Sequence, residues 1–277
     1  MNAAGPAAIS GIGELADRYD AFFVDQFGVL HDGVAPYPQA AEALSQLVQA
    51  GKQVVILSNS GKRSAPNAAR LEGLGFTRGS WTHFLSSGEV AWSLLAAQTG
   101  HRRCLLLARD GDRSAIDGLT IELAESGADC DLVLIAGSEG DAKPLADYAA
   151  LLAPAASRRV PAYCTNPDKQ MLTPHGLRFG AGRIAELYEE LGGAVTWIGK
   201  PFPEIYAAAR RLIGEIDPAR ILCLGDSVEH DITGARGAGL DSLLITGGIH
   251  AGEDEAGLAE RYAAGAVPNF ILPGFRW

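Results

Sequence analysis

The chain has 277 residues, a formal net charge of −10 and a hydrophobic content of 47%, so it can bury a sizeable core and is not expected to be disordered. The acidic balance argues against nucleic acid or an anionic membrane surface as the main partner. No apolar run approaches the roughly 18–20 residues of a membrane-spanning helix, and residues 1–10 lack the basic flank and apolar core of a signal peptide. We therefore expect a cytoplasmic protein with one large domain or two smaller ones.

The cysteines are scattered along the chain, at Cys104, Cys130, Cys164 and Cys223. Their spacing fits neither a zinc site nor a disulfide framework. Buried, reduced thiols in a cytoplasmic protein are the expected state.

Strands and helices alternate in the first third of the chain. The predicted elements are a short helix at 9–17, strands at 21–24 and 53–57, and helices at 39–50 and 66–74. Strand, helix, strand, helix with short connections is typical of a parallel sheet.

The middle of the chain repeats this pattern and predicts a second α/β unit. Its elements are strands at 82–85, 104–108, 132–136 and 160–164, and helices at 89–98, 145–152 and 184–191. A glycine-rich passage at 165–182 comes before the last of these helices and is the expected return hinge.

The last third of the chain again alternates clearly. It predicts strands at 194–198 and 221–224, a final strand at 242–246, and helices at 203–213 and 231–238. We expect the two ends of the chain to build one sheet, and the three C-terminal residues, Phe275 to Trp277, to pack on its core.

Polar side chains stand at the ends of four predicted strands. They are Asp25, Ser58 with Asn59, Lys200, and Asp226 followed by Asp231. If these strands are parallel neighbours, the side chains converge on one crevice beyond the carboxyl ends of the strands. Carboxylates with a backbone carbonyl suit Mg²⁺, whereas a hydroxyl, backbone amides and a lysine would hold an anion. Because a carboxylate attacks a phosphate dianion poorly unless metal and lysine offset the repulsion, this combination indicates phosphoryl transfer.

Each of these residues also has a structural interpretation. The acids at the strand ends could cap turns, and Lys200 could be a surface lysine. Ser58 and Asn59 are residue types that form turns, as is Asp168 in the return passage. Asp231 could be the N-cap of the helix that follows it, and the sequence leaves this interpretation open beside a catalytic one.

The motifs around these residues resemble those of the haloacid dehalogenase superfamily. Four segments carry the resemblance: D-Q-F-G-V-L at 25–30, S-N-S at 58–60, G-K-P at 199–201 and G-D-S-V-E-H-D at 225–231. Three more resemble class IIA, the NagD-like phosphatases with a C2 cap: H-D-G-V-A-P-Y-P-Q-A at 31–40, C-T-N-P-D at 164–168 and D-I-T-G-A-R-G-A-G-L at 231–240. The resemblance implies an α/β fold with a Rossmann-like three-layer core at 1–86 and 183–277, and an inserted C2-type α/β cap at 87–182.

The resemblance also implies how the acids would work. Asp25 would be the nucleophile that forms an aspartyl-phosphate, and it would ligate Mg²⁺ as well. Asp226 and the backbone carbonyl of Phe27 would be further metal ligands. Asp231 would orient Lys200 or a metal-bound water.

The other motif residues would bind the phosphoryl group. Ser58, the Asn59 amide and Ser60 would contact the group that is transferred, and Lys200 would neutralise charge on Asp25 and on the phosphate. The implied partner is a small phosphorylated substrate, and the oligomeric state is left open, with a homodimer among the options.

Phe27 departs from the pattern of the phosphatases. Their residue at this position is a second aspartate, which protonates the leaving alcohol and later activates water. The Phe27 carbonyl can still bind a metal, but its ring cannot transfer a proton, a contribution worth roughly 10²–10⁴-fold. Hydrolysis should be slow, or restricted to good leaving groups, unless His31 or Asp32 substitutes.

The first hypothesis is therefore a Mg²⁺-dependent hydrolase that acts on a small phosphomonoester through Asp25. Phe27 keeps a second hypothesis open, a weak or inactive member that binds a phosphorylated ligand or a protein partner. An aromatic residue at this position also occurs in the haloacid dehalogenases, so carbon–halogen hydrolysis is a third hypothesis, although their cap is placed differently.

Overall fold

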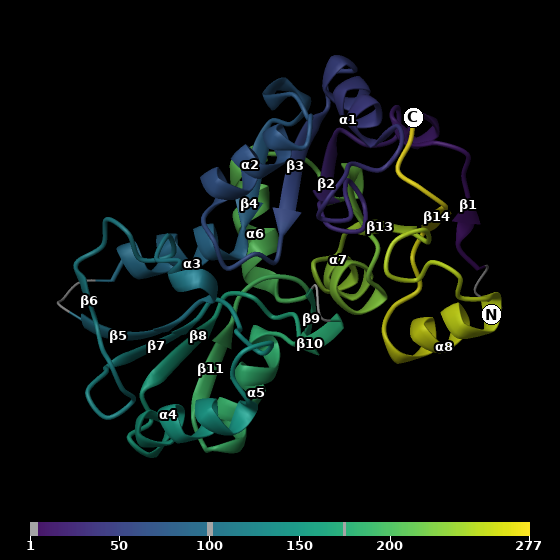
Figure 1. The fold of residues 1–277 in the computed structure, drawn as a ribbon. Helices are drawn as coiled ribbons and strands as arrows, with labels where there is room; N and C mark the ends of the chain where they lie inside the picture. The colour runs from purple at the N-terminus through teal and green to yellow at the C-terminus, as the bar shows by residue number, and fades with distance from the viewer. Residues whose placement is uncertain (1–4, 99–101, 174–175) are drawn as a thin grey trace. The chain divides into compact units, whose positions relative to one another are not determined.

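The computed structural model describes residues 5–98, 102–173 and 176–277, which form two compact units that are each interrupted in sequence (Figure 1). Unit 1 comprises Met1–Ser58, Ala68–Leu85 and Lys200–Trp277, and unit 2 comprises Asn59–Asn67 and Ser86–Gly199. Both units consist of a mainly parallel sheet covered by helices, which confirms the predicted α/β class.

The sheet of unit 1 has seven strands and places β2 centrally. In spatial order they are β1 (Ala7–Ala8), β14 (Phe270–Leu272), β13 (Asp241–Ile245), β12 (Ile221–Gly225), β2 (Ala21–Asp25), β3 (Gln53–Ser58) and β4 (His83–Ser86). The pairings from β1 through β3 are all parallel. The carboxyl ends of β12, β2 and β3 therefore lie next to one another at one edge of the sheet.

Helices cover both faces of this sheet and make three layers. The elements are α1 (Ala40–Gln49), α6 (Pro203–Ile213), α7 (Thr233–Gly237), α8 (Glu255–Ala264), the π-helical turn η5 (Val228–Ile232), and the 3-10 turns η1 (Ile12–Leu15), η2 (Arg78–Ser80) and η4 (Pro218–Arg220). Alternate strand residues such as Phe22 and Val24 pack with α1 and η1 in one core. Leu244 faces the other way, toward Val228 and Ile232 of η5, as the two-residue repeat of a strand requires.

Unit 2 is built on a five-stranded sheet and a short hairpin. The sheet order is β11 (Ala194–Trp197), β8 (Pro161–Cys164), β7 (Leu132–Ile135), β5 (Arg102–Leu107) and β6 (Ile121–Leu123), with all pairings parallel. The hairpin pairs β9 (Gln170–Thr173) with β10 (Gly176–Phe179) in antiparallel fashion. The hairpin lies in the segment that the sequence predicted only as a return hinge. Pro174 and His175 of that segment are outside the described residues.

The helices of unit 2 pack on the two faces of its sheet. They are α3 (Ser87–Ala96), α4 (Leu145–Ser157) and α5 (Ala181–Glu190), with a 3-10 turn η3 at Arg109–Gly111, while α2 (Ser64–Gly73) crosses the sequence boundary between the units. One core joins Leu105 and Val133 to α4 and α5. The other joins Cys104 and Leu132 to Leu95 of α3.

The return to unit 1 occurs later in the chain than the expected boundary at residue 183. Because β11 pairs with β8 and α5 packs in the unit 2 core, the second unit extends to Gly199. The strand that leads to Lys200 therefore belongs to the five-stranded sheet. The condition that the four strands are parallel neighbours is therefore not met for this strand, because its hydrogen-bond partner is β8.

Three further element predictions differ from the structure. The strand at 242–246 is not the last, because α8 and β14 follow it. Residues 9–17 contain only the four-residue 3-10 turn η1. The helix predicted at 231–238 begins earlier, as a π-helical turn at Val228–Ile232, and continues as α7.

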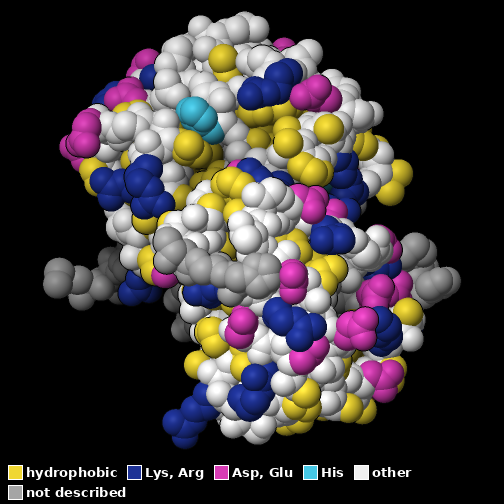
Figure 2. Space-filling view, turned by 90° about the vertical axis from the view of Figure 1, so that its left-hand side faces the viewer, with side chains coloured by type: hydrophobic (Ala, Val, Ile, Leu, Met, Phe, Trp, Pro, Cys, Tyr) yellow, Lys and Arg dark blue, Asp and Glu magenta, His cyan; other side chains and the backbone are white. Residues whose placement is uncertain are grey.

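The remaining surface and core features agree with the composition. All four cysteines are free and buried, and Phe275 is buried in the core of unit 1. On the face that Figure 2 shows, acidic and basic side chains are interspersed, and neither sign forms a continuous stripe. Among the residues that the structure describes, no helix is both long and apolar enough to span a bilayer.

Candidate active site

A tight turn follows β2 and places Asp25 at the sheet edge. The carbonyl of Gln26 accepts hydrogen bonds from the amides of Leu30 and His31, at 2.9 and 3.2 Å. Gly28 adopts φ +86° in this turn, a value that favours glycine. A Cβ at Gly28 would lie 1.8 Å from Oδ2 of Asp226, so glycine is also required for the close approach of that carboxylate.

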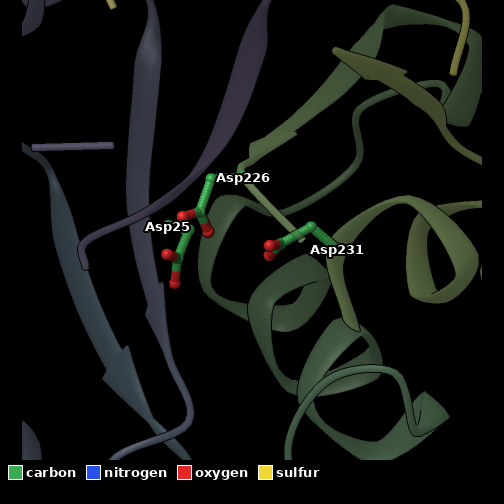
Figure 3. Close-up of side chains that lie close together, drawn as sticks. All are labelled: Asp25, Asp226 and Asp231. Atoms are coloured by element: carbon green, nitrogen blue, oxygen red, sulfur yellow. The ribbon is translucent and has the colours of Figure 1, made fainter. Parts of the chain in front are cut away.

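Three carboxylates meet beyond the carboxyl ends of β2 and β12. Asp25, Asp226 and Asp231 each offer an oxygen within 4.8 Å of the others, and all three are buried. Figure 3 shows the carboxylate of Asp231 directed toward those of Asp25 and Asp226. One oxygen of Asp226 accepts a hydrogen bond from the amide of Ile249 at 2.7 Å, which fixes its orientation.

Asp231 is not the N-cap of its helix. Ser227 holds that position, since its hydroxyl accepts a hydrogen bond from the amide of His230 at 3.1 Å. One oxygen of Asp231 accepts from the Ser227 amide at 3.1 Å, and the other accepts from Lys200 at 2.7 Å. The structure thus excludes the N-cap interpretation and places Asp231 in the charged cluster, while its catalytic role stays a prediction.

Lys200 lies between two of the acids. Its Nζ donates to Oδ1 of Asp231 and to Oδ1 of Asp25, and the residue is only 4% exposed. Burial opposes the charge on Lys200, but Asp231 and Asp25 raise its pKa above the usual value, so it is a charged ammonium. A surface lysine is therefore excluded, and its charge partly offsets that of the acids.

Burial and neighbouring charges shift the pKa values of Asp25 and Asp226. Burial, followed by the charge of Asp231, raises the pKa of Asp226 to about 7. Burial also raises the pKa of Asp25, while the ammonium of Lys200 acts in the opposite direction. Shifts of this kind arise where buried carboxylates crowd together, and they mark this cluster as a functional-site candidate.

The donor set of the cluster fits a hard divalent cation. The three acids supply carboxylate oxygens that converge within 4.8 Å, and oxygen is the ligand that Mg²⁺ prefers. Desolvated acids with raised pKa values also gain when a cation replaces their protons. Asp25, Asp226 and Asp231 are therefore suited to hold a cation such as Mg²⁺, and the backbone carbonyl of Phe27 stays a predicted ligand.

Ser58 lies beside Asp25 in unit 1, at the end of the neighbouring strand. Leu57 pairs with Asp25 in the β2–β3 register, so Ser58 is the next residue beyond that pair. Ser58 is 3% exposed, and its hydroxyl accepts a hydrogen bond from Nε2 of Gln26 at 2.6 Å.

Asn59 and Ser60 belong to unit 2, although they follow Ser58 directly. Nδ2 of Asn59 donates to Oδ1 of Asp168 at 2.9 Å. The hydroxyl of Ser60 accepts a hydrogen bond from the amide of Lys62 at 3.3 Å. Asp168 thus has a defined partner within the predicted S-N-S motif, and is more than a turn residue.

The ring of Phe27 packs on the loop that follows. It contacts His31 edge-to-face, with centroids 5.7 Å apart, and a Cβ at Gly33 would lie 2.9 Å from its Cε2 atom. The side chain is nevertheless 48% exposed. An aromatic ring with a solvent-facing surface therefore occupies the position of the missing acid.

Neither of the two suggested substitutes is a proton donor in this arrangement. His31 is buried, its Nδ1 accepts from the Gly33 amide at 2.9 Å, and burial lowers its pKa to about 4. His31 is therefore neutral at pH 7. The carboxylate of Asp32 accepts from the amides of Val34 and Ala35, both at 2.8 Å, which lower its pKa and make it a turn residue.

Sequence reasoning missed one residue of the cluster's surroundings. Gln26 stands between Asp25 and Phe27, yet only the structure shows its hydrogen bond to Ser58. The available signal was its character: it is a polar residue at the end of an otherwise apolar strand, next to the predicted nucleophile.

Comparisons with known proteins agree with this geometry. A family model described as haloacid dehalogenase-like hydrolase matches residues 22–122, and a HAD-hydrolase-like model matches residues 197–272. A haloacid dehalogenase-like hydrolase from Brucella suis 1330 is 32% identical, with a TM-score of 0.84, over 96% of this chain and 99% of that one.

Two further relatives carry functional names. Chronophin from Rattus norvegicus is 28% identical over 88% of this chain and 82% of its own. A glycerol phosphate phosphatase from Mycobacterium tuberculosis, solved in complex with magnesium, is 27% identical over 95% of this chain and 77% of its own, with a TM-score of 0.74. With two family models in chain order and a 32% identical structure of the same family, the chain belongs to the haloacid dehalogenase-like hydrolases.

Proposed function

We propose that this protein is a cytoplasmic, Mg²⁺-dependent phosphatase that hydrolyses a small phosphomonoester through an aspartyl-phosphate at Asp25. The observation that carries the proposal is the buried ammonium of Lys200, which is held between Asp25 and Asp231 beside the third acid, Asp226. Relatives named as phosphatases, among them the magnesium-bound glycerol phosphate phosphatase, support the same reaction class.

In this proposal, Asp25 attacks phosphorus. One of its oxygens forms a bond to phosphorus as the bond to the leaving oxygen breaks, and the electron pair of that bond departs with the leaving group. Water then attacks phosphorus, which releases inorganic phosphate and restores the carboxylate. Asp25 is suited to this role because it ends a rigid central strand and is oriented by Lys200.

The other residues stabilise charge and orientation. Asp25, Asp226 and the Phe27 carbonyl would hold Mg²⁺, which supplies positive charge against the phosphate when bound. Lys200 offsets the charge of Asp25, and Asp231 keeps the ammonium in place. Ser58 would donate to a phosphoryl oxygen, and the Asn59 amide and Ser60 stay predicted contacts of the same group.

Phe27 sets the range of substrates. With a neutral His31 and an Asp32 engaged in its turn, the leaving oxygen receives no proton from these residues. Esters whose leaving group is stable as an anion, such as aryl phosphates, should react faster than alkyl phosphates.

Phosphate release from a panel of aryl and alkyl esters with Mg²⁺ tests the proposal. Wild type should turn over p-nitrophenyl phosphate, and Asp25→Asn, which keeps the shape but removes the nucleophile, should fall to background. Beryllofluoride, a phosphoryl mimic, should bind wild type with Mg²⁺ and not Asp25→Asn, as observed by fluorine NMR. Equal turnover by wild type and Asp25→Asn would refute a nucleophilic role.

A second candidate function is binding of a phosphorylated ligand or protein partner without turnover. The exposed ring of Phe27 at the acid position favours it. If wild type releases no phosphate from any ester while Phe27→Asp does, the binding function is correct and the phosphatase proposal fails.

A further inference from the structure

We propose that Arg70 determines substrate specificity, and that the substrate is a phosphomonoester whose leaving group carries a second anionic group, a carboxylate or a phosphate, which Arg70 binds. This inference rests on the proposed function, since it names the class of ester that the same site accepts. Arg70 lies in the part of α2 that belongs to unit 1, the unit that also contains Asp25 and Phe27.

The guanidinium of Arg70 reaches the loop that follows the proposed nucleophile. Its Nη2 donates a hydrogen bond to the carbonyl of Gly33 at 2.8 Å. A Cβ at Gly33 would lie 2.9 Å from Cε2 of Phe27 and 3.5 Å from Nη2 of Arg70. The edge of the Phe27 ring and the guanidinium therefore lie against the same glycine, on the loop that begins at Asp25.

The charge of Arg70 is not matched by an acid. Arg70 is exposed, and within the described ranges 5–98, 102–173 and 176–277 it forms no ion pair with a carboxylate. Asp32 of the same loop instead accepts hydrogen bonds from the amides of Val34 and Ala35. A guanidinium has five N–H donors and binds a carboxylate or a phosphate through two parallel hydrogen bonds. Because Gly33 engages only Nη2, Nε and Nη1 keep their hydrogens for such a ligand.

Apolar surface lies beside this positive charge. The ring of Phe27 is about half exposed, and Val34, the residue after Gly33, is exposed as well. After burial, the charge of Arg70 is the next cause of the lowered pKa of His31, whose ring contacts Phe27, so the positive potential extends to this part of the loop. An ester with its phosphoryl group at Asp25 could pack its carbon chain on Phe27 and place a second anionic group at Arg70.

Phosphonates test this recognition, because they keep a phosphoryl group but have a P–C bond in place of the ester bond. Three series of matched chain length end in a methyl group, a carboxylate or a second phosphonate. Their inhibition constants are measured against hydrolysis of p-nitrophenyl phosphate by the full chain with Mg²⁺. Wild type should bind at least one of the two anionic series about tenfold more tightly than the methyl series, the effect of a hydrogen bond between charged groups. The series that is preferred identifies the second group as a carboxylate or a phosphate.

Substitutions of Arg70 separate recognition of the ligand from support of the loop. Arg70→Met removes the charge and the donors, so it should abolish the preference for anionic chains and change the inhibition constant of the methyl series by less than about threefold. Arg70→Glu should reverse the preference, in favour of a phosphonate that ends in an ammonium group. Arg211→Met is the matched control, because it removes an exposed arginine of unit 1 from the last turn of α6, and it should keep the preference. The urea midpoint of each variant shows whether it is folded.

Two results would overturn the inference: equal affinity of wild type for all three series, or a loss in Arg70→Met that is the same for all three, as expected if Arg70 only holds the carbonyl of Gly33. If wild type turns over p-nitrophenyl phosphate but shows no preference, the role of Arg70 fails and the phosphatase stands. If wild type has no turnover, the same affinities are measured by calorimetry with Mg²⁺. A preference there that depends on Arg70 supports recognition of a ligand with two anionic groups by a binding protein, and absence of binding by every series overturns it.

Discussion

Replacing Phe27 by aspartate should restore the proton transfer that the site lacks. The new carboxyl would stand two residues after Asp25, on the turn that Gln26 anchors. A positioned proton donor is worth roughly 10²–10⁴-fold for leaving groups that need a proton. For p-nitrophenolate, which leaves readily as an anion, the gain should be less than about tenfold.

The fold should tolerate this change. The ring is 48% exposed, so its removal forfeits about half of the 1.5–3 kcal/mol that full burial of Phe contributes. The edge-to-face contact with His31 adds about 0.5–1.5 kcal/mol. A loss of about 2 kcal/mol leaves most of a typical stability of 5–15 kcal/mol.

The assay is kcat/KM over a series of phosphate esters that differ in the pKa of the leaving group. Wild type should show a steep decline as that pKa rises, and Phe27→Asp should flatten it. Phe27→Asn is the matched control, because it has the size of aspartate but no acidic proton. A gain that is equal for aryl and alkyl esters, or equal for Phe27→Asn and Phe27→Asp, would refute the reasoning.

Three further variants test the charged cluster and the scaffold. Lys200→Met should lower the free energy of unfolding in urea by about 3–5 kcal/mol, because it leaves two buried carboxylates without their ammonium. Gly28→Ala should weaken Mg²⁺ binding in calorimetry at least tenfold, because its Cβ would displace Asp226. Glu89→Gln should destabilise the protein by about 1 kcal/mol at pH 7 and by less at pH 3, because a hydrogen bond from Arg63 lowers the pKa of Glu89.

The controls for these variants are specific. The control for Gly28 is Gly51→Ala, which places a Cβ at a residue with a similar positive φ, +75°, but in open space. This variant should leave Mg²⁺ affinity unchanged. Because the pKa of Glu89 is lower in the folded state, its ionised form stabilises the fold at pH values above the pKa of the unfolded state. This stabilisation is lost as the pH falls through the pKa of the folded state. A destabilisation of the same size at both pH values, or a Lys200→Met variant as stable as wild type, would contradict these expectations.

The strands that carry the site could be predicted because their sequences are apolar and uninterrupted. Ala21–Asp25 and Ile221–Gly225 are buried along their whole length, and the first is followed by a glycine-containing turn, whereas the second ends in a glycine. Their acids could be placed at the same sheet edge from this pattern alone. The distance between them required the structure, since only tertiary packing brings Asp231 and Lys200 to the same place.

Elements with little buried surface escaped sequence reasoning. Helix α8 has no fully buried residue, so its sequence shows no helical repeat of apolar residues that would predict it. Strand β14 has only three residues. The sequence left open whether Asp231 caps the helix that follows it, because Asp231 and Ser227 are both good capping types, and only the structure shows Ser227 in that position and Lys200 bound to Asp231. The membership of β11 was missed because strand pairing between distant segments leaves no local signal.

The buried charges of the site impose an order on its ligands. If Asp25, Asp226 and Asp231 were all ionised beside the ammonium of Lys200, negative charges would outnumber positive ones by two, and the raised pKa values of Asp25 and Asp226 reflect this crowding. A phosphate dianion arriving first would double that imbalance within a desolvated space, whereas a divalent cation arriving first cancels it. Compulsory-order kinetics follow from electroneutrality, with the metal as the leading ligand, and phosphate should bind measurably only to the metal-loaded protein.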